Sequence, residues 1–128
     1  MGADVGSTFG LVAGDDPSRG GDITVSGDIS AREIFLTAFE GPLFEGDVNI
    51  NAPITQKIPA PGSDGIIIES MNDINVNAPI VGIDYIELTT ELFDSGNDIN
   101  INAPVLAIAP SGFSEIFIES DDDIEVNV

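Results

Sequence analysis

The sequence predicts an all-β fold, a parallel β-helix of about five coils with a 25-residue period. Three observations predict it. A phrase of Asp followed by alternating apolar and polar residues recurs along the chain, as in "NDINVNAPIVG" at 72–82 and "NDININAPVLA" at 97–107. The alternation has the period of a half-buried strand, and Gly, Asn or Asp stands before every phrase.

The period of the phrase is nearly constant. The Asp residues that open the five phrases are separated by 25, 26, 25 and 25 residues, and they are Asp22, Asp47, Asp73, Asp98 and Asp123. Pro and Gly in every unit exclude paired helices, and a propeller blade needs about 40 residues. Leucine-rich repeats need Leu at fixed offsets, and Leu is scarce in this chain.

The strand that follows each Asp is expected to bury two apolar columns, because each coil can cover the row of its neighbour. The first column is Ile23, Val48, Ile74, Ile99 and Ile124, and the second is Val25, Ile50, Val76, Ile101 and Val126. A left-handed backbone is expected at the corner residues Gly21, Gly46, Asn72, Asn97 and Asp122. The pairs Ala52-Pro53, Ala78-Pro79 and Ala103-Pro104 should end the strand, with Ala inward and Pro outward.

A second apolar phrase precedes the next Asp in each repeat. It predicts a further column of Phe44, Ile68, Phe93 and Ile118. Odd repeats also contain "REIFLTA" at 32–38 and "DYIELTT" at 84–90, which even repeats lack. These segments either stack on "IIIES" and "IFIES" through alternating loop lengths or form a separate strand. The similarity of odd repeats to each other and of even repeats to each other indicates a 51-residue double repeat.

The phrases "GDITVSGDISA", "GDVNINAPI", "NDINVNAPIV" and "NDININAPV" resemble the haemagglutinin repeats of the filamentous haemagglutinin family, large secreted exoproteins of bacteria. The resemblance covers residues 21–128 and implies a right-handed β-helix that serves as an adhesin stalk. The 25-residue period is longer than the family's usual coil, and the family's secretion domain is absent. Residues 1–20 are expected to form an irregular cap or partial coil, with coils starting near 21, 46, 72, 97 and 122.

Composition excludes several classes of function. The chain has no Cys and no His, so thiolate chemistry, sulfur-based zinc sites and the usual neutral-pH base are missing. Three basic residues stand against 23 acidic ones, and the net charge of −20 disfavours nucleic acid and anionic membranes. No signal peptide or membrane span is recognisable at the N-terminus, so an export signal is expected outside this segment. Because only Arg19, Arg32 and Lys57 are basic and none lies in a repeated acidic cluster, we expect no enzyme and no cofactor.

Asn side chains form the first candidate site. Asn49, Asn51, Asn75, Asn77, Asn100 and Asn102 point outward from the predicted strands. Amides stacked at the coil spacing can hydrogen-bond up the column, which is a structural role. The same face could contact a glycan or ordered water, although an ice-binding face should be rich in Thr.

Acidic residues form the second candidate site. Asp at a corner ordinarily accepts a hydrogen bond from the backbone two residues further on. Calcium is the alternative, because it prefers clustered oxygens, and the richest positions are Asp64, Asp121, Asp122 and Asp123. We expect salt to relieve the repulsion only generally, without a specific calcium site.

These observations predict a secreted or cell-surface stalk segment whose partners are neighbouring coils of a longer protein. The alternative function is a glycan-binding module that uses the Asn face or the loops at 55–65 and 106–115, with glycans or a host surface as its partners. A calcium-stabilised, self-assembling fibre subunit is a further alternative. The last strand should leave an open edge, so we expect a monomer or a weak dimer through that edge.

Overall fold

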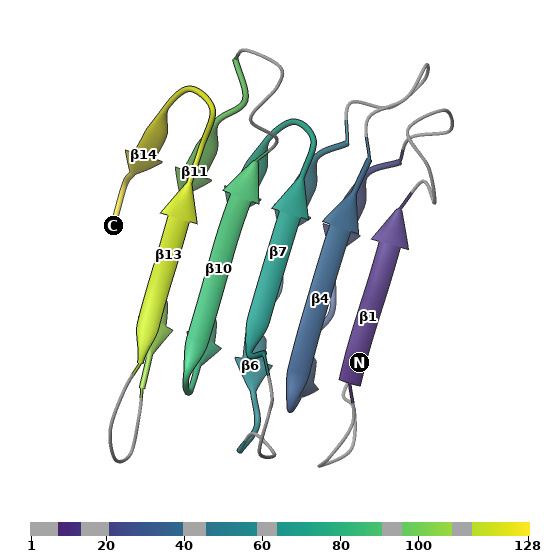
Figure 1. Cartoon of the computed structure of the whole chain (residues 1–128), viewed down its shortest axis with the longest axis vertical. Helices are drawn as coiled ribbons and strands as arrows, with labels where there is room; N and C mark the ends of the chain where they lie inside the picture. Colours follow the sequence, from purple (N-terminus) through teal and green to yellow (C-terminus); the bar gives the residue numbers. More distant parts are fainter. Residues whose placement is uncertain (1–7, 14–20, 40–45, 59–63, 91–95, 109–113) are drawn as a thin grey trace.

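The computed structural model describes residues 8–13, 21–39, 46–58, 64–90, 96–108 and 114–128. These residues form strands and connections, with no helix among them, and every strand pair is parallel (Figure 1). Sheet A contains β1 (Thr8–Ala13), β4 (Glu33–Ala38), β7 (Ile66–Ser70), β10 (Tyr85–Thr90) and β13 (Glu115–Glu119). Sheet B contains β2 (Ile23–Val25), β5 (Val48–Ile50), β8 (Ile74–Val76), β11 (Ile99–Ile101) and β14 (Ile124–Val126). Sheet C contains β3 (Ile29–Ala31), β6 (Ile54–Gln56), β9 (Ile80–Gly82) and β12 (Val105–Ala107).

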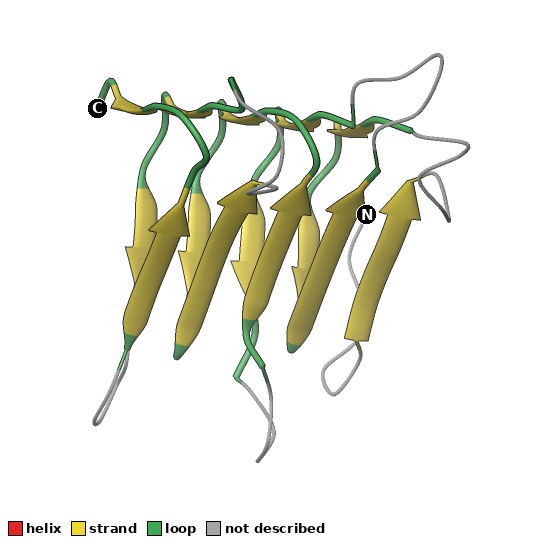
Figure 2. Cartoon of the chain, turned by 45° about the horizontal axis from the view of Figure 1, so that its top comes forward, coloured by secondary structure: helices red, strands yellow, loops and turns green. Residues whose placement is uncertain are grey.

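The chain visits the three sheets in the order B, C, A and then starts the next coil. In Figure 1 the strands of sheet A run upward on the near side, and successive coils advance from right to left. Figure 2 shows sheet B across the top and sheet C descending behind. This path is a right-handed parallel β-helix, which confirms the predicted fold class.

Sheet B forms where the Asp-apolar-Asn phrase predicted a strand. Register pairs such as Ile74 with Ile99 and Val76 with Ile101 stack the two predicted columns between coils, where these side chains are buried. The prediction of burial is wrong for the last coil. Ile124 is 45% exposed and Val126 is 59% exposed, because no coil lies above β14 among the described residues.

Sheet C follows the Ala-Pro pairs, which end the strands of sheet B as predicted. Ala52, Ala78 and Ala103 are buried, and the Pro after each of them is exposed. The Pro carbonyls accept hydrogen bonds from the coil before, as in Ile54 N–H to Pro79 O at 3.0 Å. The chain therefore turns at Pro and immediately enters a third three-residue strand, which the sequence analysis did not identify.

The strand pairing in sheet A decides between the two interpretations of the variable segments at 32–38 and 84–90. Segments 34–36 and 86–88 both stack on 66–68, so odd and even repeats contribute to one sheet. In one coil, one residue separates β3 from β4 and nine residues separate β4 from β5. In the next coil, nine residues separate β6 from β7 and three residues separate β7 from β8. The nine-residue connection thus lies between sheets A and B in one coil and between sheets C and A in the next, while the period of the repeat stays constant.

The expected column of Phe44, Ile68, Phe93 and Ile118 is wrong for the same reason. Ile68 pairs with Leu36 and Leu88, and Leu88 pairs with Ile118. Phe44 and Phe93 lie outside the described residues.

Corner geometry also differs from the prediction. Of the five expected left-handed residues only Gly46 has a positive φ, of 89°, and no described non-Gly residue has one. In the fourth coil the left-handed residue is Gly96, one position before Asn97. Asn72, Asn97 and Asp122 instead take ordinary backbone conformations, and hydrogen bonds to neighbouring coils hold these corners, as in Asp122 N–H to Asn97 O at 3.1 Å.

Candidate functional site

Two ladders of Asn side chains cross the outer face of sheet B. In the inner ladder the Asn75 Nδ2 donates to Asn49 Oδ1 and the Asn100 Nδ2 donates to Asn75 Oδ1, both at 3.0 Å. In the outer ladder Asn77 donates to Asn51 and Asn102 donates to Asn77, again at 3.0 Å. All six predicted Asn residues therefore lie on one face and bond coil to coil, as the structural interpretation required.

The two ladders differ in burial and in how they end. Asn49, Asn75 and Asn100 are half-buried, whereas Asn51, Asn77 and Asn102 are exposed. The outer ladder continues into the last coil, where the Asn127 Nδ2 donates to Asn102 Oδ1 at 2.9 Å. The inner ladder stops at Glu125, which takes the register position above Asn100 and has no side-chain N–H to donate.

The Asp column bonds in a way that the sequence analysis did not predict. The first four carboxylates of the column each accept a backbone N–H from the Asp one coil further on, instead of the local turn bond that was expected. The four bonds are Asp47 N–H to Asp22, Asp73 N–H to Asp47, Asp98 N–H to Asp73 and Asp123 N–H to Asp98, at 3.0, 3.1, 2.9 and 3.2 Å. Repetition of Asp at this corner therefore serves to tie successive coils together.

Asp73 lies in the middle of this column, and its pKa is raised above the ordinary value of 3.8. Burial between coils is the largest cause, and the carboxylates of Asp47 and Asp98 add to it, while the N–H of Asp98 acts in the opposite direction. Since the folded protein binds this proton more tightly than the unfolded chain does, Asp73 destabilises the fold when it is charged.

The contribution of Asp73 to the free energy of unfolding is therefore most favourable below 3.8. It is expected to be lost as the pH rises through the raised pKa of folded Asp73. Asp73→Asn keeps an oxygen for the Asp98 N–H and removes the charge. The variant should melt at a higher temperature than the parent at pH 7, and the difference should shrink on acidification. Asp64→Asn, a carboxylate outside the column, is the control. A constant difference across pH would contradict this account.

The calcium candidates lie at two different corners. Asp64 precedes β7 where sheet C turns into sheet A, whereas Asp121, Asp122 and Asp123 lie between β13 and β14, where sheet A turns into sheet B. The Asp64 N–H donates to Glu33 Oε2 at 2.9 Å, and the Asp121 N–H donates to Thr90 Oγ1 at 3.1 Å. Within the described ranges, no group of three or more acidic side chains is arranged to hold a metal ion.

Calcium is expected to act on stability only through ionic strength. Sodium and calcium chloride at equal ionic strength should raise the melting temperature alike, because both screen the carboxylates. A specific site would instead saturate, and at 100 times its Kd it would add about 2.7 kcal/mol to the free energy of unfolding. Calorimetric melts across a calcium titration distinguish the two, and a saturable rise would contradict the expectation.

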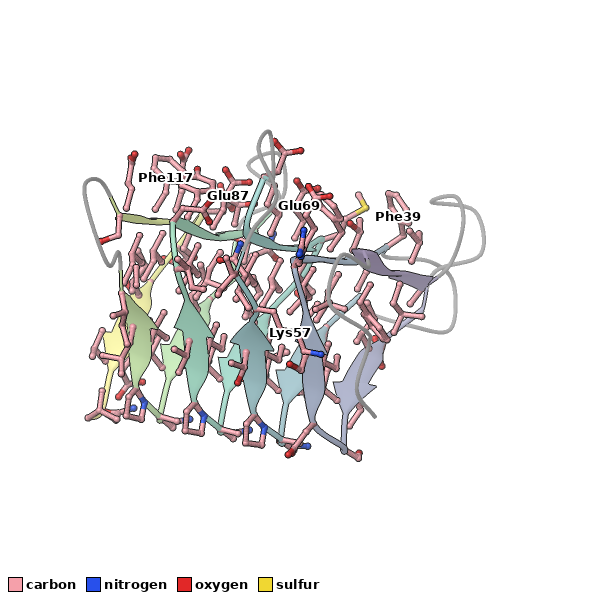
Figure 3. All side chains as sticks on the ribbon, turned by 90° about the horizontal axis from the view of Figure 1, so that it is seen from below. Phe39, Lys57, Glu69, Glu87 and Phe117 are labelled. Atoms are coloured by element: carbon pink, nitrogen blue, oxygen red, sulfur yellow. The ribbon has the colours of Figure 1, made fainter. Side chains whose placement is uncertain are left out.

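The outer face of sheet A carries acidic and aromatic side chains. Figure 3 shows Glu69, Glu87 and Phe117 on its outward side. The Tyr85 hydroxyl donates to Glu87 Oε1 at 2.8 Å. Burial, followed by the contact with Glu87, raises the pKa of Tyr85 to about 12, so the phenol stays protonated at neutral pH.

Polar side chains that bond across the corners were not predicted from the sequence. The Gln56 Nε2 donates to the Arg32 carbonyl at 2.9 Å, and its Oε1 accepts the Ile83 N–H at 2.8 Å, so one side chain joins three coils. Buried Ser70 donates to the carbonyls of Gly46 and Asp73, and half-buried Ser120 donates to the Asn97 carbonyl. The recurrence of Ser before the corner, at the end of "IIIES" and "IFIES", was the available signal.

The candidate loops at 55–65 and 106–115 lie partly outside the described residues, which exclude 59–63 and 109–113. The described part of the first loop lines a shallow, largely apolar hollow together with Ile83; the lining residues are Thr55, Gln56, Lys57, Ile58 and Ile83. None of the described segments is a helix long and apolar enough to cross a membrane.

The fold and its columns define the chain as a parallel β-solenoid, a repeat protein whose coils are joined by main-chain and side-chain ladders. No protein-family model, no curated protein and no solved structure matches it. The resemblance to haemagglutinin repeats therefore rests on the repeated phrases alone.

Proposed function

We propose that this β-solenoid is a structural stalk segment of a secreted or cell-surface exoprotein of the adhesin type, and that it is not an enzyme. The observation that carries the proposal is that its repeated polar side chains bond to the next coil. Asn75 donates one amide N–H to Asn49 and accepts one from Asn100, and the Asp73 carboxylate accepts a main-chain N–H from the next coil. Repetition of Asn and Asp at the same register positions thus joins successive coils and fixes their register.

The distribution of charge supports the same proposal. Carboxylates lie on the outer face of sheet A and along the Asp corner, so one face and one edge of the solenoid carry negative charge. A high net charge keeps a long repetitive protein soluble and discourages association between strand edges. In this proposal the partners of the segment are neighbouring coils of a longer parent protein.

Antibodies against the chain test the location. They should label intact cells of the source organism or detect the protein in its medium. Labelling that requires cell lysis would contradict the stalk proposal.

A glycan-binding module is the second candidate, and the outer Asn ladder favours it. Asn51, Asn77 and Asn102 each retain a second amide N–H in a fixed, exposed position. A glycan array probed with the chain, with a variant whose loops at 55–65 and 106–115 are shortened, and with Asn77→Ala separates the two. The stalk proposal expects no specific binding. Binding lost in one variant would replace it and would assign the loops or the ladder.

A further inference from the structure

The outer face of sheet A has a small hollow near the corner where the chain turns toward sheet B. Three neighbouring coils form it, at the ends of β4, β7 and β10. Its volume is about 100 Å³, which is room for roughly three water molecules at about 30 Å³ each. A hollow of this size admits one small headgroup.

The side chains that line the hollow come from two outward positions of each strand. Glu69 lies in register between Thr37 of the coil before and Thr89 of the coil after. Phe39 and Met71 lie two positions further along the chain than Thr37 and Glu69 and also line the hollow. Figure 3 shows Glu69 and Phe39 on the same, outward side of sheet A. The hollow therefore combines one carboxylate and two hydroxyls with an apolar wall.

The charge of this face selects the class of ligand. The five strands of sheet A contain no Lys or Arg, and their acidic residues all point outward. These residues are Glu33, Glu69, Glu87, Glu115 and Glu119. Together with the net charge of −20, they raise the local concentration of cations and repel anions.

We propose that the hollow binds the ammonium group of a lysine side chain, presented by a basic polypeptide that lies across sheet A. An ammonium has three N–H donors and no acceptor, which suits a carboxylate flanked by two hydroxyl oxygens. The apolar stem of the lysine packs on Phe39 and Met71, and the ring of Phe39 attracts the cation. Glu87 and Phe117, on the same face, are available to further residues of the peptide.

Calorimetric titration of the whole chain with a short peptide of alternating Lys and Ala measures the binding. Glu69→Gln keeps the size of the side chain and removes its charge, so it should weaken binding at least about tenfold. Glu125→Gln removes the same charge on sheet B and should change the affinity less than about twofold. Equal losses in the two variants would assign the binding to net charge alone and overturn the proposal.

A second pair of variants tests the hydroxyls. Thr37→Val removes one acceptor and keeps the shape, so it should weaken binding about threefold, whereas Thr55→Val on sheet C should leave it unchanged. The same peptide with acetylated lysines should not bind, because acetylation removes the charge. Free spermidine that binds as tightly as the peptide would overturn the choice of a polypeptide partner. Circular dichroism melts check that each variant is folded.

Amide NMR of the parent chain gives a readout that needs no variant. On addition of the lysine peptide, the shift changes should centre on Thr37, Glu69 and Thr89. Changes that centre on the Asp corner instead would overturn the proposal. A ligand at this face is not part of the stalk function, so the failure of either proposal leaves the other standing.

Discussion

Ile74→Asp is expected to unfold the chain at 25 °C. Ile74 is fully buried between Val48 and Ile99, in the middle of the first column of sheet B. A carboxylate at this position would lie between two coils without a cationic partner, at a cost of several kcal/mol. The total stability of a domain is only about 5–15 kcal/mol. Circular dichroism should therefore show a large loss of cooperative β-structure.

Ile124→Asp is the matched control, because it makes the same change in the same column at the open end of the solenoid. Ile124 is 45% exposed, so the carboxylate reaches water and the cost should stay below about 1 kcal/mol, close to the roughly 0.5 kcal/mol of ordinary surface substitutions. Urea titrations give the comparison: Ile124→Asp should keep a cooperative transition near that of the parent, and Ile74→Asp should show none. Equal midpoints would show that the column is not the buried seam of the solenoid.

The sequence predicted the part of the fold in which apolar residues recur at the 25-residue period and also alternate with polar residues along the strand. Sheet B was found because Ile74 and Ile99 recur at one offset from Asp and alternate with Asn. Sheet C was not found, because the middle residue of its strands is polar in 29–31 and 54–56 but apolar in 80–82 and 105–107, so no alternation repeats from coil to coil. Its signal was the aliphatic residue after each Ala-Pro pair.

Sheet A could not be predicted in register, because the long connection alternates between two corners. A fixed period then aligns Ile68 with Phe93 in sequence, although the chain places Leu88 beside it. The inward residues still alternate within each strand, so the strands themselves were visible. Only their alignment depended on knowing where the extra residues lie.

The candidate site was predicted in position but not in its bonding. The Asn ladders follow directly from the outward positions in stacked strands. The partner of the Asp73 carboxylate, the N–H of Asp98, is 25 residues away, and local turn rules contain no information about it. Asp64, which suggested calcium, is followed by Gly65, whose positive φ forms the corner between sheet C and sheet A.

Gly65→Ala is expected to cost several kcal/mol at that corner. Gly65 has a φ of +84°, and an added Cβ would lie 2.3 Å from the carbonyl oxygen of Tyr85 in the next coil. The Gly65 carbonyl also accepts the N–H of Ile34 from the coil before, at 3.0 Å, so the backbone is held on both sides. The left-handed conformation costs about 1–2 kcal/mol, and relieving the clash adds about 1–3 kcal/mol.

Gly96→Ala separates these two contributions. Gly96 has a similar φ of +95°, but an added Cβ meets nothing within 4 Å. It should therefore show the backbone cost alone, and Gly65→Ala should be less stable by about 1–3 kcal/mol in urea titrations. Similar values for the two variants would mean that the coils separate easily at this corner, and that the close stacking of Gly65 against Tyr85 contributes little to the register of the solenoid.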